Sequence, residues 1–200
     1  KNKKTAVVTG AAGFIGSHMV DLLLSKNFNV IGIDNLVGGH EKNLKHHTDN
    51  KNFNLEVCDI NKLQNKNSFF SNTDYVFHFA GIGDIVPSIE KPYEYFNTNV
   101  LGTISILNIL KNYSIKKFVY AASSSCYGLA KTPTNENHPI DPKYPYALSK
   151  YQGEQCCLHW QNIYNLPVVS IRIFNAYGPR VRTTGAYGAV FGVFLKQKLE

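Results

Sequence analysis

The chain has 200 residues, of which 44% are hydrophobic and 12% aromatic, a composition that fits one globular domain or one domain and the start of another. Its 21 basic and 14 acidic residues give a formal net charge of +7, which suits an anionic ligand, but the basic residues are scattered and no nucleic-acid-binding motif accompanies them. Nucleic acid is therefore not expected as a partner. No apolar run approaches the length of a membrane span, so a membrane is not expected either.

Apolar residues recur with two periods that alternate along the chain. Short apolar or alternating runs predict strands at residues 5–9, 29–34, 53–57, 75–79, 117–122 and 168–173. Helical spacing predicts helices at residues 14–26, 92–113 and 145–164, and Pro145 suits a first helical position. The asparagine-rich stretch 35–52 is expected to be a long loop or a ragged helix. This order favours an α/β fold, a Rossmann-type doubly wound parallel sheet with helices on both faces.

Three glycines follow the first predicted strand and open the first predicted helix, in Gly10-Ala11-Ala12-Gly13-Phe14-Ile15-Gly16. Glycines there permit close backbone approach to a pyrophosphate, and the helix N-terminus offers free N–H groups and a positive dipole end. The spacing is GxxGxxG rather than the usual GxGxxG, and a glycine turn without a ligand is the alternative. The placement between strand and helix favours a dinucleotide site.

Two carboxylates end the next predicted strands. Asp34 can accept hydrogen bonds from both hydroxyls of an adenosine ribose and would repel a 2′-phosphate, which favours NAD over NADP. Asp59 could bind the adenine amine, with a helix N-cap as the alternative.

The cysteines and histidines predict neither disulfides nor a metal site. Cys58, Cys126, Cys156 and Cys157 form no CxxC pair, which is typical of a reduced, cytoplasmic protein, and no signal peptide precedes the first strand. His46-His47 and Cys156-Cys157-Leu158-His159 contain metal-binding residue types, but neither run has a matching second half in the sequence. We therefore expect no metal.

Tyr146 and Lys150 are four residues apart in the predicted 145–164 helix and so project from one face. A lysine charge beside a phenol favours the phenolate, and a phenol needs such help because its reference pKa is about 10. A tyrosine and a lysine at this spacing are often only exposed residues on the surface of a helix. In a chain that also has the glycine loop and Ser123, the pair predicts a general acid/base.

Together, the glycine loop, Asp34, Cys58-Asp59-Ile60, His78-Phe79-Ala80-Gly81, the run NTNVLGT at 97–103 and Tyr146/Lys150 resemble the extended short-chain dehydrogenase/reductase family. The resemblance covers essentially the whole chain and is closest to nucleotide-sugar 4-epimerases. It implies NAD as cofactor and a homodimer formed through the two long helices. It also implies that residues 1–174 are the NAD-binding Rossmann domain, and that residues 175–200 begin a substrate-binding portion whose remainder is missing.

The resemblance implies a role for each matching residue. Tyr146 would be the general acid/base, Lys150 would hold the nicotinamide ribose, and Ser123 would polarise the substrate carbonyl. Asn99 would fix the lysine through water. The implied cofactor-binding residues are Gly10, Gly13, Phe14, Ile15, Gly16, Asp34, Asn35, Asp59, Ile60, Phe79, Ala80, Gly81, Asn99, Tyr146 and Lys150.

The segment 121–128, Ala-Ala-Ser-Ser-Ser-Cys-Tyr-Gly, separates the branches of the family. Related 4,6-dehydratases carry Asp and Glu at the positions of Ser124 and Ser125, and UDP-glucuronate decarboxylases carry Glu at the second. Serine cannot act as a carboxylic acid in water elimination. The segment therefore favours epimerisation at C4 through a transient 4-keto sugar, with a nucleotide-sugar dehydratase or net oxidoreductase as the alternative. A catalytically silent NAD-binding protein would require loss of Ser123, Tyr146 or Lys150.

The substrate contacts implied by the resemblance are Ser88, Ser124, Ser125, Asn175 and Arg182. Arg180 is a further candidate for a phosphate, with plain surface charge as the alternative. Gly83 stands where some UDP-galactose 4-epimerases have lysine, which leaves room for a bulkier or charged sugar. The expected substrates are of the UDP-glucose, UDP-N-acetylglucosamine or UDP-glucuronate type.

Overall fold

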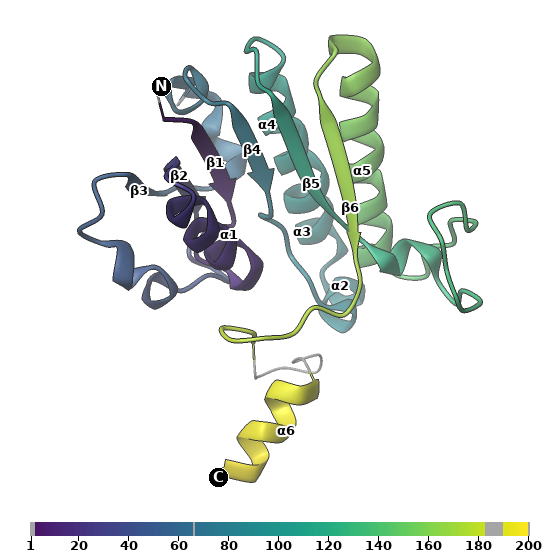
Figure 1. The fold of residues 1–200 in the computed structure, drawn as a ribbon. Coiled ribbons are helices and arrows are strands. Elements are labelled where there is room, and N and C mark those ends of the chain that lie inside the picture. Colours follow the sequence, from purple (N-terminus) through teal and green to yellow (C-terminus); the bar gives the residue numbers. More distant parts are fainter. Residues whose placement is uncertain (1–2, 66, 183–189, 200) are drawn as a thin grey trace.

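Six parallel strands form one sheet in the order β3-β2-β1-β4-β5-β6 (Figure 1). The computed structural model describes residues 3–65, 67–182 and 190–199. The strands are β1 (Thr5–Thr9), β2 (Asn29–Asp34), β3 (Phe53–Val57), β4 (Tyr75–His78), β5 (Lys117–Ser123) and β6 (Val168–Ile173). All lie within a residue of their predicted bounds. The predicted α/β class with a doubly wound parallel sheet is confirmed.

Alternating side chains of β1 supply two separate cores. Ala6 and Val8 face α1 (Phe14–Ser25), where they pack with Val20 and Leu23. Val7 faces the opposite layer, which contains α4 (Thr103–Leu110) and α5 (Pro145–Tyr164). This is the period-two alternation of a strand that is buried on both faces. Figure 1 shows α1 on one side of the sheet and the helices α3, α4 and α5 on the other.

The shorter helical elements connect these layers. They comprise α2 (Ile85–Glu90), α3 (Pro92–Phe96) and the 3₁₀ turns Glu41–Asn43, Lys45–His47, Ile60–Asn65, Asn67–Phe70 and Ser124–Tyr127. The stretch 35–52 is therefore a loop with two 3₁₀ turns, within the range of its prediction. After β6, α6 (Val190–Leu199) lies apart from the two layers (Figure 1). Within the described ranges, none of the helices combines the length and apolar character that crossing a bilayer requires.

The predicted continuous helix at 92–113 is wrong in its middle and at its end. A π-helix, Asn97–Gly102, separates α3 from α4, which ends at Leu110. The hydroxyl of Thr103 donates to the Asn99 carbonyl at 2.7 Å, so a side chain uses an acceptor of the helix ladder. Such π segments inside α-helices are frequent at functional sites, and this one carries Asn99.

Gly153 lets α5 approach the sheet and the π-helix. A Cβ at this position would clash with the hydroxyl of Tyr120 and lie 2.7 Å from the Asn99 carbonyl oxygen. Tyr120 is fully buried and its hydroxyl donates to the Lys150 carbonyl, so it has little room to move. The absence of a side chain at Gly153 therefore fixes the position of the helix that carries Tyr146 and Lys150.

Candidate active site

The candidate site lies at the carboxyl ends of the strands, beside the point where β1 and β4 are neighbours. Strand β1 leads into the glycine turn, β2 ends at Asp34, β4 leads into residues 79–81, and β5 ends at Ser123. The crossover direction reverses between β1 and β4, because β2 and β3 lie on one side and β5 and β6 on the other. Open parallel sheets bind ligands in the crevice outside this switch point.

The glycine turn packs directly against the segment that follows β4. Gly10 has φ +66°, and a Cβ there would lie 2.7 Å from the Ala80 nitrogen and 2.9 Å from the Phe79 carbonyl oxygen. A Cβ on Gly16 would clash with the Gly10 carbonyl, so the first turn of α1 also needs glycine. Gly13 is the N-cap of α1 and offers no side-chain cap, which leaves the first backbone N–H groups available to an anion.

Phe14 and Ile15 begin α1 and are half-buried. They line a groove of about 430 Å³ on the outer side of that helix, together with His18, Met19, Leu22, Tyr177, Gly178 and Pro179. This groove does not include Ser123, Tyr146 or Lys150.

Asp34 is 7% exposed and its two oxygens hold the glycine turn against the loop that follows β2. Oδ2 accepts from the Ala12 N–H at 2.9 Å, and Oδ1 accepts from the Leu36 N–H at 2.8 Å. An ionised carboxylate has about four acceptor sites. Each oxygen therefore keeps capacity for a ribose hydroxyl.

Asp59 serves as a cap in this structure. Its Oδ1 accepts from the Asn61 N–H at 2.8 Å, and its Oδ2 accepts from the Asn35 side chain at 3.3 Å. Ile60 is 5% exposed and packs in the core near Gly102. Only the backbone of Ile60 is suited to meet a ligand.

Ser123, Ser125 and Tyr146 come together although they lie on three elements. The Tyr146 hydroxyl donates to Ser123 Oγ at 3.3 Å, and the Ser123 and Ser125 hydroxyls are 2.5 Å apart. The Ser125 N–H also donates to Ser123 Oγ, at 3.2 Å. The Tyr95 ring packs edge-on to the Tyr146 ring, with centroids 6.3 Å apart. Ser124 begins the 3₁₀ turn and is half-buried.

Lys150 is 7% exposed and lies beside residues 79–81. Its Nζ is 4.6 Å from the centre of the Tyr120 ring and 3.5 Å from the point where a Cβ on Gly81 would stand. Burial lowers the pKa of Lys150 to about 8, although Cys157 and Glu154 act in the opposite direction. A site that keeps an ammonium poorly solvated makes it an effective partner for hydroxyl groups or an anion.

Asn99 fixes the segment between β4 and α2. Its Oδ1 accepts from the Ile82 N–H at 2.8 Å, and its Nδ2 donates to the Ile82 carbonyl at 3.1 Å and to Ser149 Oγ at 3.0 Å. A Cβ on Gly81 would stand 2.9 Å from Asn99 Oδ1. The structure thus brings Gly81, Asn99 and Lys150 into one small region.

Sequence reasoning gave His78 no role, yet it connects the glycine turn to Asn99. Thr103 uses its proton on the Asn99 carbonyl, so it accepts from His78 Nε2 at 2.9 Å. His78 Nδ1 then accepts from the Thr9 hydroxyl at 2.6 Å. Burial, and secondarily Lys150, lower the pKa of His78 to about 3, which keeps the ring neutral. The sequence signal that points to His78 is the presence of a histidine inside an otherwise apolar strand.

The predicted substrate residues lie in different surroundings. Ser88 is fully buried, and its hydroxyl donates to the Ile85 carbonyl at 2.5 Å. Asn175 is exposed in the segment after β6. Arg182 pairs with Asp84 at 3.0 Å. Arg180 pairs with Asp21 of α1 at 2.8 Å, on the outer side of that helix.

Comparison with known proteins agrees with this geometry. The family model described as the NAD dependent epimerase/dehydratase family matches residues 6–200, and the chain belongs to this family. A putative UDP-glucose 4-epimerase of Methanocaldococcus jannaschii is 37% identical over 196 residues, which cover 97% of this chain and 63% of the relative. The predicted resemblance is confirmed.

Two solved structures are similar throughout the chain. A UDP-N-acetylglucosamine 4-epimerase from Methanobrevibacter ruminantium M1, in complex with UDP-N-acetylmuramic acid, has a TM-score of 0.94 and 32% identity, and covers 100% of this chain and 64% of that one. A UDP-glucuronic acid 4-epimerase from Bacillus cereus, in complex with UDP-glucuronic acid and NAD, has a TM-score of 0.88 and 31% identity, with coverage of 98% and 63%. The chain thus spans a little under two thirds of these relatives.

Replacing Lys150 with methionine tests the poor solvation of its ammonium. The folded-state pKa of about 8 lies below the ordinary value of 10.5, so between these values the unfolded state binds more protons. The contribution of Lys150 to the free energy of unfolding therefore rises from pH 8 to pH 10.5, by on the order of 3 kcal/mol. Denaturant unfolding of wild type and Lys150→Met at several pH values should give a stability difference that moves in favour of wild type as pH rises. Buried groups such as Tyr120 and Cys157 are common to both proteins and cancel. A stability difference between the two proteins that stays constant with pH would contradict the lowered pKa of Lys150.

Proposed function

We propose that the full-length protein is an NAD-dependent nucleotide-sugar 4-epimerase. We also propose that residues 1–174 are its NAD-binding domain and that residues 175–200 begin its substrate-binding portion. The observation that carries the proposal is the hydrogen bond between Tyr146 and Ser123, which lies at the carboxyl ends of the strands. Tyr146 is on the same helix as the buried Lys150. The similarity to solved 4-epimerases supports it.

The residues at the switch point suit NAD. The N–H groups at the start of α1 would receive the pyrophosphate, and Asp34 would bind the adenosine ribose through its remaining acceptor sites. Lys150 would bind the nicotinamide ribose hydroxyls. When bound, NAD would accept a hydride from C4 of the sugar and return it to the opposite face.

The side chains of the chain itself would move the proton. As a phenolate, Tyr146 removes the proton of the C4 hydroxyl, and Ser123, 3.3 Å away, passes it on or binds the carbonyl oxygen that forms. Ser125 orients Ser123 through two contacts, one from its hydroxyl and one from its N–H. After the 4-keto sugar has rotated to present its opposite face, Tyr146 returns the proton.

The partners of these hydroxyls favour epimerisation over dehydration. Among the described residues, no carboxylate hydrogen-bonds with Ser123, Ser125 or Tyr146. Elimination of water needs an acid for the leaving hydroxyl and a base for the C5 proton. A nucleotide-sugar dehydratase or a net oxidoreductase remains the second candidate. Deuterium incorporation at C5 would identify a dehydratase, and consumption of added NAD would identify a net oxidoreductase.

The direct test incubates the full-length protein with UDP-glucose, UDP-N-acetylglucosamine and UDP-glucuronate and follows C4 stereochemistry by NMR in deuterated water. We expect inversion at C4 of at least one sugar, without consumption of added NAD and without deuterium at C5. Tyr146→Phe should lower kcat by about 10²-fold or more, because the proton-transfer group is lost. Tyr144→Phe is the matched control, since Tyr144 precedes α5 and is 44% exposed. Deuterium at C5, or equal losses in the two variants, would refute the epimerase mechanism.

Replacing Asp34 with asparagine tests its role in cofactor binding. Asp34→Asn keeps the size of the side chain but removes the charge, so NAD affinity should fall by about tenfold or more, because hydrogen bonds to charged groups are worth about 1.5–3 kcal/mol. Discrimination against NADP should weaken as well, since the repulsion of the 2′-phosphate is lost. Calorimetric titration with both cofactors measures the ratio. Asp59→Asn is the control, because it should change both affinities equally.

We further propose a cytoplasmic homodimer. The four cysteines are free, which supports a reducing compartment. Large apolar side chains remain exposed along the outer side of the α3–α5 layer: Tyr93 (78%), Leu101 (51%), Leu148 (36%) and Leu158 (36%). An exposed apolar face of this kind suits a second copy. Sedimentation of the full-length protein as a monomer would contradict the dimer.

A further inference from the structure

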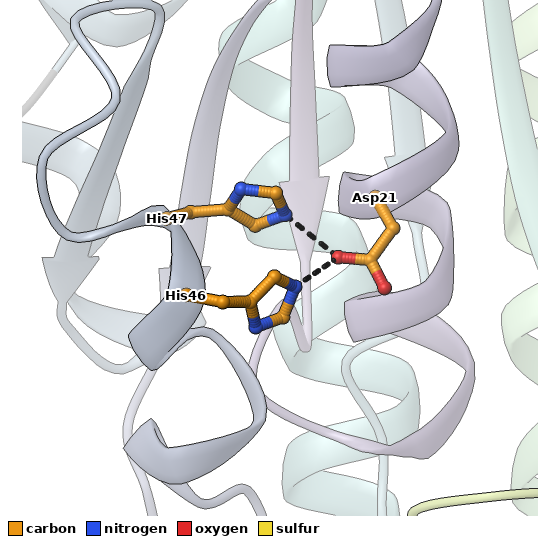
Figure 2. A group of neighbouring side chains, drawn as sticks. All are labelled: Asp21, His46 and His47. Atoms are coloured by element: carbon orange, nitrogen blue, oxygen red, sulfur yellow. Dashed lines mark hydrogen bonds and ion pairs between the residues drawn. The ribbon is translucent and has the colours of Figure 1, made fainter.

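Three potential metal ligands converge on the outer side of α1, away from the candidate active site. Asp21 comes from the middle of α1, and His46 and His47 come from the 3₁₀ turn Lys45–His47. Figure 2 shows both imidazole rings directed at the same carboxylate. The Nε2 atoms of His46 and His47 lie 2.8 and 2.7 Å from Asp21 Oδ1, and the three ligand atoms are all within 4.8 Å of one another.

These separations are close to those of a coordination sphere. With metal–ligand bonds of about 2.0–2.1 Å, neighbouring ligands of a tetrahedral ion are about 3.3 Å apart. The oxygen–nitrogen distances would need to open by about half an ångström, which small side-chain rotations provide. Imidazole nitrogen with one carboxylate oxygen is a ligand set that suits zinc-like ions.

The carboxylate is held so that one oxygen remains for the histidines. Arg180 Nη2 binds the other oxygen, Asp21 Oδ2, at 2.8 Å. Ligating carboxylates in metal sites are commonly hydrogen-bonded in this way, which fixes their orientation.

The histidines offer both a firm support and an open side. His47 is 15% exposed, and its ring packs edge-on to Phe53 with centroids 5.9 Å apart. His46 is 47% exposed, and its ring lies 4.1 Å from that of His47. An ion can thus reach the three ligand atoms from solvent, and a water molecule can complete the coordination.

We propose that Asp21, His46 and His47 form a binding site for one divalent transition-metal ion of the zinc class, with water as the remaining ligand. Without the ion, both rings donate an Nε2 proton to Asp21 Oδ1. On binding, each neutral ring carries its proton on Nδ1 instead, and Nε2 coordinates the ion.

The site would connect α1 to the loop that supports the glycine turn. In that loop the His40 N–H and the Asn43 side chain both donate to the Ala12 carbonyl, at 3.0 and 2.8 Å. An ion bound at Asp21 would therefore restrain the loop on two sides, at α1 and at the glycine turn. We expect it to raise the stability of this part of the fold by mass action.

Calorimetric titration of the metal-stripped full-length protein with Zn²⁺, and with Co²⁺ followed by visible absorption, tests the proposal. We expect one ion per chain, and an affinity lowered by about tenfold or more in His46→Asn and in His47→Asn. His40→Asn is the matched control, because His40 is an exposed histidine of the same loop outside the cluster, and it should bind as wild type does.

Thermal unfolding supplies a second measurement that does not depend on enzyme activity. Zn²⁺ should raise the unfolding midpoint of wild type and His40→Asn but not that of His47→Asn. Because His46 is largely exposed, His46→Asn should fold normally, which circular dichroism checks, and so it keeps the test decisive if His47→Asn is unstable. Absence of saturable binding to wild type, or equal loss in His40→Asn and His46→Asn, would overturn the proposal.

Discussion

The close approach of the glycine turn to the segment after β4 determines the geometry of the whole candidate site. Gly10 lies against Phe79 and Ala80, and the next residue, Gly81, lies against Asn99 and Lys150. Three residues, Phe79 to Gly81, therefore join the part of the candidate site at the glycine turn to the part that contains Asn99 and Lys150. Overpacking of a rigid backbone contact costs about 1–3 kcal/mol, and here it would also displace one end of the site relative to the other. The glycines at these positions are therefore required by the packing itself, in addition to their proposed role in ligand binding.

A line of buried polar groups makes this junction rigid. Thr9, His78, Thr103 and the Asn99 carbonyl form consecutive hydrogen bonds from β1 across β4 to the π-helix. Each of these four groups is hydrogen-bonded, which removes the cost of about 1–3 kcal/mol that an unpaired buried group would carry. If Thr103 instead donated its proton to His78 Nε2, the Asn99 carbonyl would lose the hydrogen bond from Thr103. The network therefore selects a single tautomer of His78 and a single position for Asn99.

The sequence predicted what depends on local pattern and missed what depends on contacts between distant residues. Strand periods, the glycine turn and the Tyr146–Lys150 pair were all visible, because each occupies a few consecutive residues. The π-helix was not visible, since its six residues fit an α-helical apolar pattern. Sequence spacing gives His46 and His47 no further ligand, because Asp21 lies 25 and 26 residues earlier, on a separate helix. Sequence spacing identifies a metal site only when its ligands are close together in the chain.

The two arginines after β6 differ in how free they are to bind a diphosphate. Arg182 pairs with Asp84 in a bridge whose arginine is 59% exposed, and exposed pairs contribute about 0–1 kcal/mol. A doubly charged diphosphate could displace such a partner at little cost. Arg180 is 23% exposed and belongs to the cluster of Asp21, which both histidines also hold. Withdrawing Arg180 would leave a partly buried carboxylate short of a partner. Arg182 is therefore freer than Arg180 to bind a diphosphate, and Arg180 secures the segment after β6 to α1.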